Sequence, residues 1–353
     1  MNNLKKIKKT LTKFSNFKKL TKHSKSSKSL QNSNILEKKS LKKNKTQINK
    51  KPTLFYVLIV LAFFANIAFA LKAYDDFIDS KTVEHQQIAS LVASDYEGFL
   101  NYSQLLLNSV NHEILKSKSF GDKTVDILSS IDRIRNQNNL ANQMYFEGML
   151  YWIDSNKYLI ASSAGKVLKP IDLSSRDYLE KTEHEPWKLQ VGKAIIGALS
   201  GQYILPIAVG VSGEKGYHLG TSVLSVRIES LVSKIRMSLD KNVGSFAVLS
   251  NEGRVVFESN KKNNSKLLEQ IAQNYDFSNK LGVVKKFNLF KSDDFFVVAS
   301  RVLEYPFTIF YSVDNDTIID QLFWLMTPYL VNLMLLIMIV IFNPFSLRSR
   351  VLK

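Results

Sequence analysis

The sequence predicts an α+β protein in which a long N-terminal helix runs alongside two antiparallel-sheet lobes, flanked by two transmembrane helices. Three observations lead to this prediction. Two stretches, residues 54–71 and 322–342, are apolar and uncharged. Apolar residues after the first stretch recur at helical spacing, and short strand-like runs then follow in two similar rounds.

Residues 54–71 and 322–342 are each long enough to cross a bilayer as a helix, because about 20 apolar residues span a hydrocarbon core of about 30 Å. The alternative for the first stretch is a signal peptide, and the alternative for the second is a buried core helix. A long Lys-rich segment precedes the first stretch, and no A-x-A-like cleavage site follows it. The second stretch has no charge along its whole length, so two membrane spans are favoured.

The net charge of +17 is concentrated at the two ends of the chain. Residues 1–51 contain 17 Lys and one Glu, and residues 343–353 contain three basic residues, so residues 52–342 together carry −2. Lys and Arg favour cytoplasmic flanks, which predicts cytoplasmic termini and an extracytoplasmic region at 72–321. Residues 1–51 are predicted to be a disordered tail lying on the lipid bilayer. Nucleic-acid binding is not expected, because no aromatic residues or motif accompany the Lys residues.

The chain contains no Cys, which excludes disulfides, thiolate metal sites and a Cys nucleophile. It also lacks a Gly-rich phosphate loop, a G-x-S-x-G string and a repeated metal-ligand spacing. The cluster Glu180, Glu183, His184 and Glu185 is interpreted as a solvated surface. We therefore expect no enzyme, no metal and no cofactor.

Apolar spacings of three, four and seven predict a long helix from about Tyr74, which continues out of the first span. Its apolar residues are Ile88, Leu91, Val92, Tyr96, Phe99, Leu106, Val110 and Ile114. A second helix follows Gly121. Its predicted apolar face consists of Val125, Leu128, Ile131 and Ile134.

Two rounds of a hairpin, a helix and three strands follow. The first round comprises a hairpin at 145–162, a helix at 174–181 capped by Ser174, strands at 189–196, 203–211 and 217–226, and a closing helix at 229–239. The second comprises a hairpin at 245–258, a helix at 265–273, and strands at 283–290, 295–302 and 307–313, before a helix at 316–321 enters the second span. The order indicates an internal structural repeat.

Several strings resemble the double Cache family of PAS-like periplasmic sensor domains in bacterial two-span receptors. They are Trp152-Ile153-Asp154 with Leu159 to Ser163, Asp172 to Tyr178, Ser200-Gly201 with Ile204 to Val211, Gly220 to Val226, and Phe246 to Leu249 with Gly253 and Val255. The segment from Asp172 to Tyr178 is similar to the family's D-x-S-x-R-D-Y helix. The resemblance covers about residues 75–318 and implies a ligand-binding distal lobe at about 145–226 and a proximal lobe at about 243–313.

Within the implied pocket, Arg176 is the leading candidate, because a guanidinium can hold a carboxylate through two hydrogen bonds. The alternative for Arg176 is a structural ion pair with Asp172 or Asp177. Tyr178 would donate its hydroxyl to the same ligand, or would be a core aromatic residue. In family members that bind amino acids, an aromatic pair comes directly after this Arg. Here the two residues after Arg176 are Asp177 and Tyr178. This departure counts against an amino-acid ligand.

Three further aromatic residues are candidates for ligand contact. Trp152 and Tyr203 would form walls of the pocket, since aromatic faces suit organic ligands. Trp187 follows Pro186 in a predicted loop, where it would act as a lid or a plug. Core packing is the alternative for each of the three.

The expected function is a multi-pass protein of a bacterial inner membrane that senses a small carboxylate-type ligand through a periplasmic domain. No kinase, cyclase or methyl-accepting coiled coil flanks the spans, so the signal would pass to a separate cytoplasmic signalling protein. Family members often dimerise through the first helix, and the face from Ile88 to Ile114 permits a homodimer. One alternative is a non-signalling envelope protein or a receptor remnant. Another is a Lys-rich tail that docks on lipid or nucleic acid, with the ectodomain as its anchor.

Overall fold

The computed structural model of the chain describes residues 50–117, 122–142, 147–213, 216–237, 239, 244–260, 265–285 and 295–342. The predicted tail at 1–51 lies outside the described residues except for its last two, and the tail at 343–353 lies wholly outside them. The chain divides into two compact units, one formed by residues 65–337 and the other by 1–64 with 338–353. Both lobes belong to the unit 65–337.

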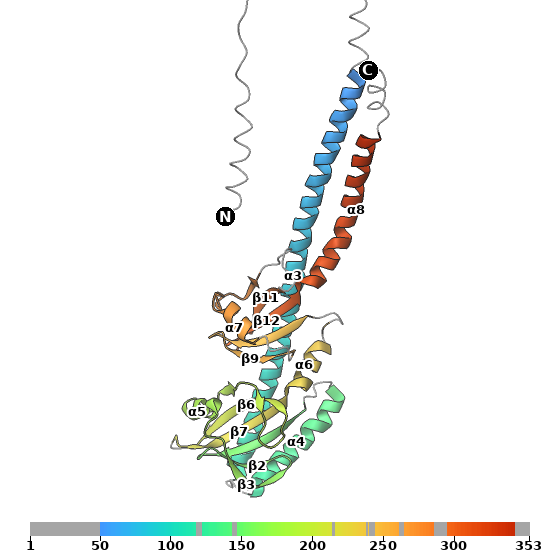
Figure 1. Ribbon diagram of the computed structural model, residues 1–353. Coiled ribbons are helices and arrows are strands. Elements are labelled where there is room, and N and C mark those ends of the chain that lie inside the picture. Colours follow the sequence, from blue (N-terminus) through green and yellow to red (C-terminus); the bar gives the residue numbers. More distant parts are fainter. Residues whose placement is uncertain are drawn as a thin grey trace, which may run out of the picture. The chain divides into compact units, whose positions relative to one another are not determined.

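The predicted long helix is present as α3 (Lys50–Ser117), 68 residues without interruption. Within 65–337 it runs alongside both sheets (Figure 1). Its predicted apolar face is buried over most of its length, including Val92, Tyr96, Val110 and Ile114. The last helix is α8 (Asn315–Ile341). Both helices are long and apolar enough to cross a membrane, judged by length and composition.

The two lobes are built from antiparallel sheets with corresponding strand orders. The first lobe contains β1 (Gly148–Asp154), β2 (Tyr158–Ser162), β3 (Gly165–Asp172), β4 (Leu189–Val191), β5 (Ile195–Ile196), β6 (Tyr203–Ser212) and β7 (His218–Arg227). The second contains β8 (Ser245–Ser250), β9 (Val255–Glu258), β10 (Leu281–Lys285), β11 (Phe295–Arg301) and β12 (Phe307–Asp314). The path β2-β1-β7-β6-β4 in the first sheet matches β9-β8-β12-β11-β10 in the second. The predicted repeat is therefore confirmed as a repeat of topology.

Within the described residues, four shorter helices accompany α3 and α8. They are α4 (Asp122–Asn142), α5 (Asp177–His184), α6 (Ile228–Met237) and α7 (Ser265–Ala272). Each corresponds to a helix predicted from the sequence, with shifted ends. The predicted cap Ser174 is wrong, because α5 begins after Arg176, which has an extended backbone and no side-chain capping bond. Ser174 instead donates its backbone N–H to Asp172. On α4, Arg135 is buried and the predicted core residue Ile134 is exposed.

Strand β3 was not predicted from the sequence. It pairs with β2 at the edge of the first sheet, and most of its side chains are exposed. The predicted strand at 189–196 is present as two short strands, β4 and β5, which both pair with β6.

The two faces of the first sheet pack against different helices. On one face Leu150, Trp152 and Leu224 join α3, α4 and α6 in a large apolar cluster that also includes residues of the second lobe. On the other face Tyr151, Ile153 and Val223 pack against Tyr178 and Leu179 of α5. We call this second side the α5 face. Because strand side chains alternate between faces, Trp152 and its neighbour Tyr151 point in opposite directions.

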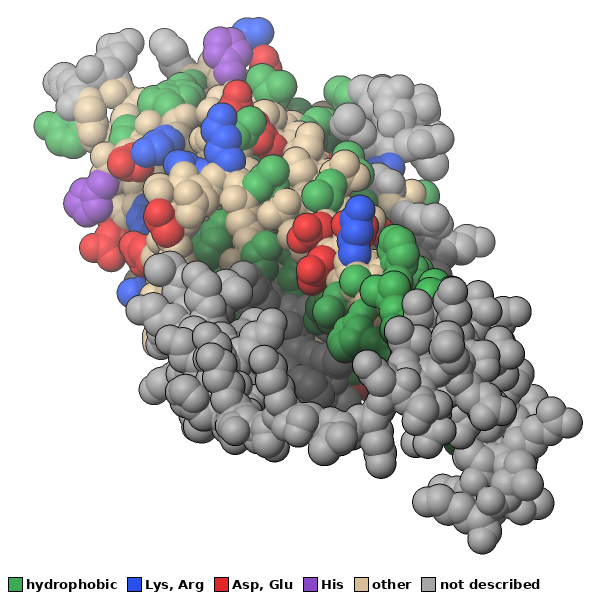
Figure 2. All heavy atoms as spheres, turned by 90° about the horizontal axis from the view of Figure 1, so that it is seen from above, with side chains coloured by type: hydrophobic (Ala, Val, Ile, Leu, Met, Phe, Trp, Pro, Cys, Tyr) green, Lys and Arg blue, Asp and Glu red, His purple; other side chains and the backbone are tan. Residues whose placement is uncertain are grey.

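Charged side chains of both signs are interspersed on the face of the molecule drawn in Figure 2. This distribution agrees with the near-neutral charge of residues 52–342. No large area of one sign is seen there among the side chains that the structure describes.

Candidate functional site

A small cavity lies on the α5 face, between the sheet and the start of α5. Its polar lining residues are Tyr151 on β1, Ser225 on β7, Arg176 before α5 and Tyr178 within it. The segment 197–199, which follows β5, provides a further wall. We call this space the Arg176 cavity. Residues distant in the sequence thus bring a guanidinium and three hydroxyl groups to one place.

Arg176 has no counter-charge from the part of the chain that the structure describes. Among the residues that the structure describes, its side chain makes neither an ion pair nor a hydrogen bond. The two carboxylates proposed as its structural partners accept backbone N–H groups, Asp172 from Ser174 and Asp177 from Tyr178. The structural ion pair is therefore not formed, and the guanidinium could hold an anion.

The tyrosine hydroxyls of the cavity are held protonated. Burial raises the pKa of Tyr178 to about 12, and the nearby Arg176 guanidinium partly opposes this rise. Burial also raises the pKa of Tyr151, against a hydrogen bond with Ser225. Both phenols are neutral near pH 7. Tyr151 donates to the sulfur of Met149 at 3.4 Å, and because a thioether is a weak acceptor, a carboxylate could take its place; both phenols could then donate to a carboxylate.

Close backbone approaches hold α5 against the sheet. A Cβ atom at Gly210 on β6 would lie 2.2 Å from the carbonyl oxygen of Thr182, so only glycine permits this approach. The hydroxyl of Thr182 lies 3.0 Å from that of Thr221, deep in the interface. A Cβ atom at Gly192 would lie 2.5 Å from the ring of Tyr178. The position of Tyr178 is therefore set by glycines on the facing backbone.

The Arg176 cavity is small. Its volume is about 30 Å³, enough for one or two water molecules. A neighbouring cavity of about 300 Å³ shares Tyr151, Ile204 and Ser225 with it. Ion pairs surround this neighbour, with Arg227 bound to Glu147 and Arg135 bound to Asp132. A ligand of several heavy atoms would need the side chains between the two spaces, or the segment 197–199, to move.

The structure brings together two of the five predicted contact residues, Arg176 and Tyr178. Trp152 is fully buried on the opposite face of the sheet. Trp187 lies between α5 and β4 with a φ of 67° and is 41% exposed, and its N–H bonds to the carbonyl of Gly210. Trp187 is not among the residues that line the Arg176 cavity. Trp187 therefore lies in the loop after α5, outside the cavity.

The sequence analysis missed Tyr151 and Ser225 as lining residues. Each belongs to a predicted strand, so the alternation of the strand was the available signal. The residue beside Trp152 had to face the other way. Which face α5 covers could not be read from that alternation.

The corresponding face of the second lobe is filled by aromatic side chains. The ring of Phe310 on β12 stacks on Phe277 at 6.1 Å with an interplanar angle of 7°. Tyr275 packs edge-on against both rings, at 5.2 and 5.5 Å. Among the described residues, a polar cavity is found on the α5 face of the first lobe, whereas aromatic rings occupy the corresponding face of the second.

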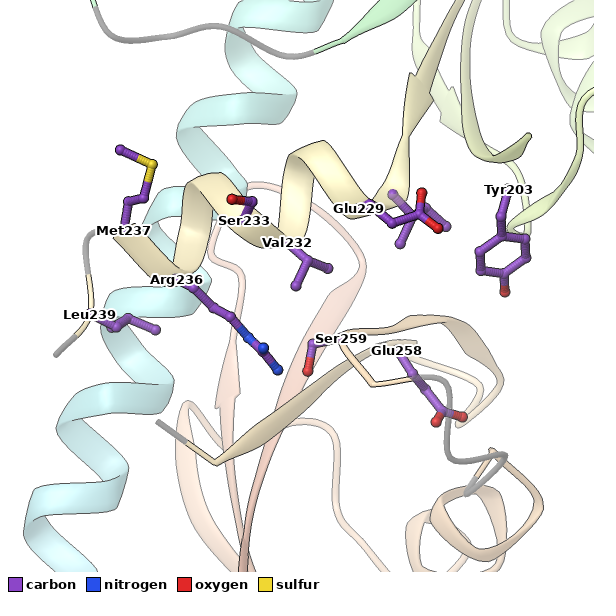
Figure 3. A pocket seen from close by; sticks show the side chains of 10 residues that line it. Tyr203, Glu229, Val232, Ser233, Arg236, Met237, Leu239, Glu258 and Ser259 are labelled. Atoms are coloured by element: carbon purple, nitrogen blue, oxygen red, sulfur yellow. The ribbon is translucent and has the colours of Figure 1, made fainter. Parts of the chain in front are cut away.

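Tyr203 lines a third space, which lies between the lobes. This inter-lobe cavity of about 720 Å³ is bounded by α6, by Tyr203 at the start of β6, and by Glu258 and Ser259 at the end of β9 (Figure 3). Its volume is within the usual range for small-molecule sites, about 300–1,000 Å³. Tyr203 therefore belongs to a different cavity from Arg176.

A scan against protein-family models finds no match, and a search of curated proteins finds none either. Solved structures are similar in fold. The extracellular domain of rpHK1S-Z16, described as a histidine kinase, has a TM-score of 0.49 and 15% identity, covering 67% of this chain and 94% of its own. The ligand-binding domain of the Pseudomonas fluorescens chemoreceptor CtaA, in complex with L-valine, has a TM-score of 0.49 and 14% identity, covering 67% and 97%.

The sensory domain of the Campylobacter jejuni chemoreceptor Tlp3, with isoleucine bound, has a TM-score of 0.47 and 13% identity, covering 69% of this chain and 96% of its own. The likeness is one of fold, at identities too low to carry site residues across. The matched structures are extracellular sensory or ligand-binding domains of two chemoreceptors and of a protein described as a histidine kinase.

Proposed function

We propose that this chain is a membrane-anchored sensor that binds a small carboxylate compound at the Arg176 cavity, in an extracytoplasmic domain. The observation that carries the proposal is the meeting of the half-buried Arg176 guanidinium, which has no ion pair among the described residues, with the hydroxyls of Tyr178, Tyr151 and Ser225. A carboxylate there would accept charge-assisted bonds from Arg176 and neutral bonds from the phenols. Both apolar helices would cross a bacterial inner membrane, with the lobes in the periplasm and the chain ends in the cytoplasm.

Helix α3 offers a path from the site toward the first apolar segment. Asn111 on α3 donates to the carbonyl of Val209 in the first sheet, at 3.5 Å. The hydroxyl of Tyr305 in the second lobe lies 2.7 Å from the amide oxygen of Asn101 and 3.0 Å from that of Gln104, both on α3, and its single hydrogen is shared between them. A ligand that favours one arrangement of the first lobe would shift α3 by its differential affinity for that arrangement. A separate cytoplasmic protein would then read the displacement of the spans.

The small volume of the cavity favours a second candidate, a non-signalling envelope protein or a receptor remnant. In that case Leu199 and Ile204 fill the space permanently, and Arg176 has no ligand. In a sensor, segment 197–199 moves outward when the carboxylate enters. The two candidates therefore differ in whether any carboxylate binds.

The test uses the full chain in lipid nanodiscs, screened by thermal shift against a panel of carboxylate metabolites. We expect at least one compound to raise Tm, and Arg176→Ala to abolish that shift. Tyr178→Phe should weaken the binding of that compound, because it removes one hydroxyl donor. Arg254→Ala is the matched control, since Arg254 is an exposed arginine in the β8–β9 turn.

Two results would contradict the sensor proposal. One is a chain that unfolds cooperatively but gains no stability from any compound in the panel. The other is a ligand-induced shift that Arg176→Ala leaves intact. An in-cell crosslinking pulldown tests the output step, and the absence of any signalling protein among its products would overturn that step alone.

A further inference from the structure

A large cavity beside the second sheet is bounded by α3, the end of α6, the end of β12 and the start of α8. Its volume is about 950 Å³, within the usual range for small-molecule sites, about 300–1,000 Å³. His85 of α3 is among its lining residues, and we call this space the His85 cavity. It shares no lining residue with the Arg176 cavity.

His85 presents unused hydrogen-bonding groups to this cavity. The residue is 6% exposed, and neither ring nitrogen has a hydrogen-bond partner among the described residues. Burial lowers the pKa of His85 below its ordinary value of 6.5, so near pH 7 the neutral ring has one nitrogen that donates and one that accepts. Buried polar groups in native proteins nearly always have partners, so a bound molecule is expected to supply them here.

Two hydroxyl groups of the same cavity are also available as donors. The ring of Tyr311 lies 5.7 Å from that of His85, and its hydroxyl oxygen accepts the backbone N–H of Gly244 at 2.9 Å. Burial raises the pKa of Tyr311, so this phenol stays protonated. The hydroxyl oxygen of Ser245 accepts from the Asn260 amide at 3.5 Å. Neither hydroxyl hydrogen has an acceptor in the described part of the chain, so both can donate to a ligand.

The charged residues that line the cavity balance one another. Lys81 and Glu84 form an ion pair at 2.6 Å. Arg236 and Asp314 are exposed and opposite in charge, and neither has an ion pair within the ranges that the structure describes. A charged ligand would therefore meet groups of its own sign as well as of the opposite sign. The neutral donors and the acceptor nitrogen of His85 are what remains for recognition.

We propose that the His85 cavity is a second ligand site, specific for a neutral sugar. A sugar hydroxyl both donates and accepts, so it satisfies the two kinds of ring nitrogen at His85 and accepts from Tyr311 and Ser245. The C–H groups of the sugar ring pack on Ile88 and Ile318. A sugar that carries a charge binds less well, because the balanced lining does not compensate the loss of its hydration. This site is independent of the function proposed for the Arg176 cavity.

A sugar in this cavity touches both long helices at once. Ile88 belongs to α3, and Ile318 belongs to α8. Binding therefore stabilises the packing of these two helices against the second sheet. The expected effect is a higher unfolding temperature in the presence of the sugar.

Isothermal titration calorimetry with the full chain in nanodiscs tests the proposal. The neutral probes are glucose, galactose, maltose and trehalose. Glucuronate and glucosamine are the charged controls, because they keep the glucose ring and carry a negative and a positive group. We expect at least one neutral probe to bind at least tenfold more tightly than either control. His85→Phe keeps an aromatic ring without the nitrogens, and Tyr311→Phe removes only a hydroxyl. Each should weaken that binding at least tenfold.

Matched variants separate this site from the rest of the chain. His112→Phe on α3 and Tyr217→Phe make the same substitutions at exposed residues and should have no effect. Arg176→Met should also leave sugar binding unchanged, which separates this proposal from the one for the Arg176 cavity. The proposal is overturned if no neutral probe binds, or if glucuronate or glucosamine binds equally well. It is also overturned if His85→Phe and Tyr311→Phe proteins that unfold cooperatively bind the sugar as wild type does.

Discussion

The backbone N–H of Ala194 donates a 3.0 Å hydrogen bond to the carbonyl oxygen of Val256, and so joins the first lobe to the second. Ala194 immediately precedes β5, and the segment after β5 lines the Arg176 cavity. Val256 lies in β9 of the second sheet. The wall of the cavity is therefore linked directly to the second lobe, in addition to the link through α3.

Removing this hydrogen bond should loosen the connection between the lobes. Ala194→Pro has no N–H to donate, and we expect it to lower the free energy of unfolding by about 1 kcal/mol. Ala194→Gly keeps the donor and serves as the control for the lost methyl group. Amide hydrogen exchange in the wild-type chain should show protection at Ala194. Equal stability of the Pro and Gly variants would show that the hydrogen bond contributes nothing.

A methyl group at Gly210 should force α5 away from the sheet. The added Cβ atom would lie 2.2 Å from the carbonyl oxygen of Thr182, which belongs to the backbone and cannot rotate aside. Overpacking of this kind costs about 1–3 kcal/mol, so Gly210→Ala should lower Tm by several degrees. Gly98→Ala is the control, because nothing lies within 4 Å of its Cβ position on α3. A Gly210→Ala protein as stable as wild type would contradict the close approach.

His85 should make the stability of the second lobe depend on pH. It is 6% exposed and packs against the rings of Phe296 and Tyr311, with ring centroids 5.7 Å away in both cases. Burial lowers its pKa below the ordinary value of 6.5, with Glu84 opposing this shift and Lys81 adding to it. Below about pH 6.5 the unfolded chain therefore binds the proton more readily than the folded one. Stability is fully present above this pH and falls as the pH drops toward the pKa of folded His85.

Thermal unfolding between pH 7.5 and 5.0 measures this effect. His85→Phe should reduce the loss of Tm on acidification. Some loss should remain, because burial also lowers the pKa of His218. An unchanged pH profile in His85→Phe would rule out His85 as its source.

The two apolar helices should be coupled through Asn66. Its side-chain amide donates to the carbonyl of Tyr329 at 3.0 Å, and its amide oxygen accepts from Asn332 at 3.2 Å. Hydrogen bonds between helices in lipid contribute about 0.6–2 kcal/mol. A double-mutant cycle with Asn66→Ala and Asn332→Ala in nanodiscs should therefore give a coupling free energy in that range. Additive effects of the two substitutions would contradict a direct interaction.

Local patterns predicted most of the elements. The spacing of Val92, Tyr96 and Val110 predicted α3, and the strand-like residues at 145–162 predicted the first hairpin. Strand β3 was not predicted, because Lys166, Lys169 and Pro170 interrupt the alternation of apolar and polar residues. The strand lies at an exposed edge of the sheet. The ends of the helices differ from the predicted ones by up to three residues, because a cap depends on backbone conformation, as at Arg176.

The sequence alone determined the two apolar helices, the order of elements, the repeat and the concentration of charge at the chain ends, because each depends on neighbouring residues. Only the tertiary structure decided that Tyr151 rather than Trp152 faces Arg176, since this depends on which face of the sheet α5 covers. It also decided that the Arg176 cavity is small and that Tyr203 lines a separate cavity. Volumes arise from the packing of side chains that lie far apart along the chain, and no local pattern encodes them.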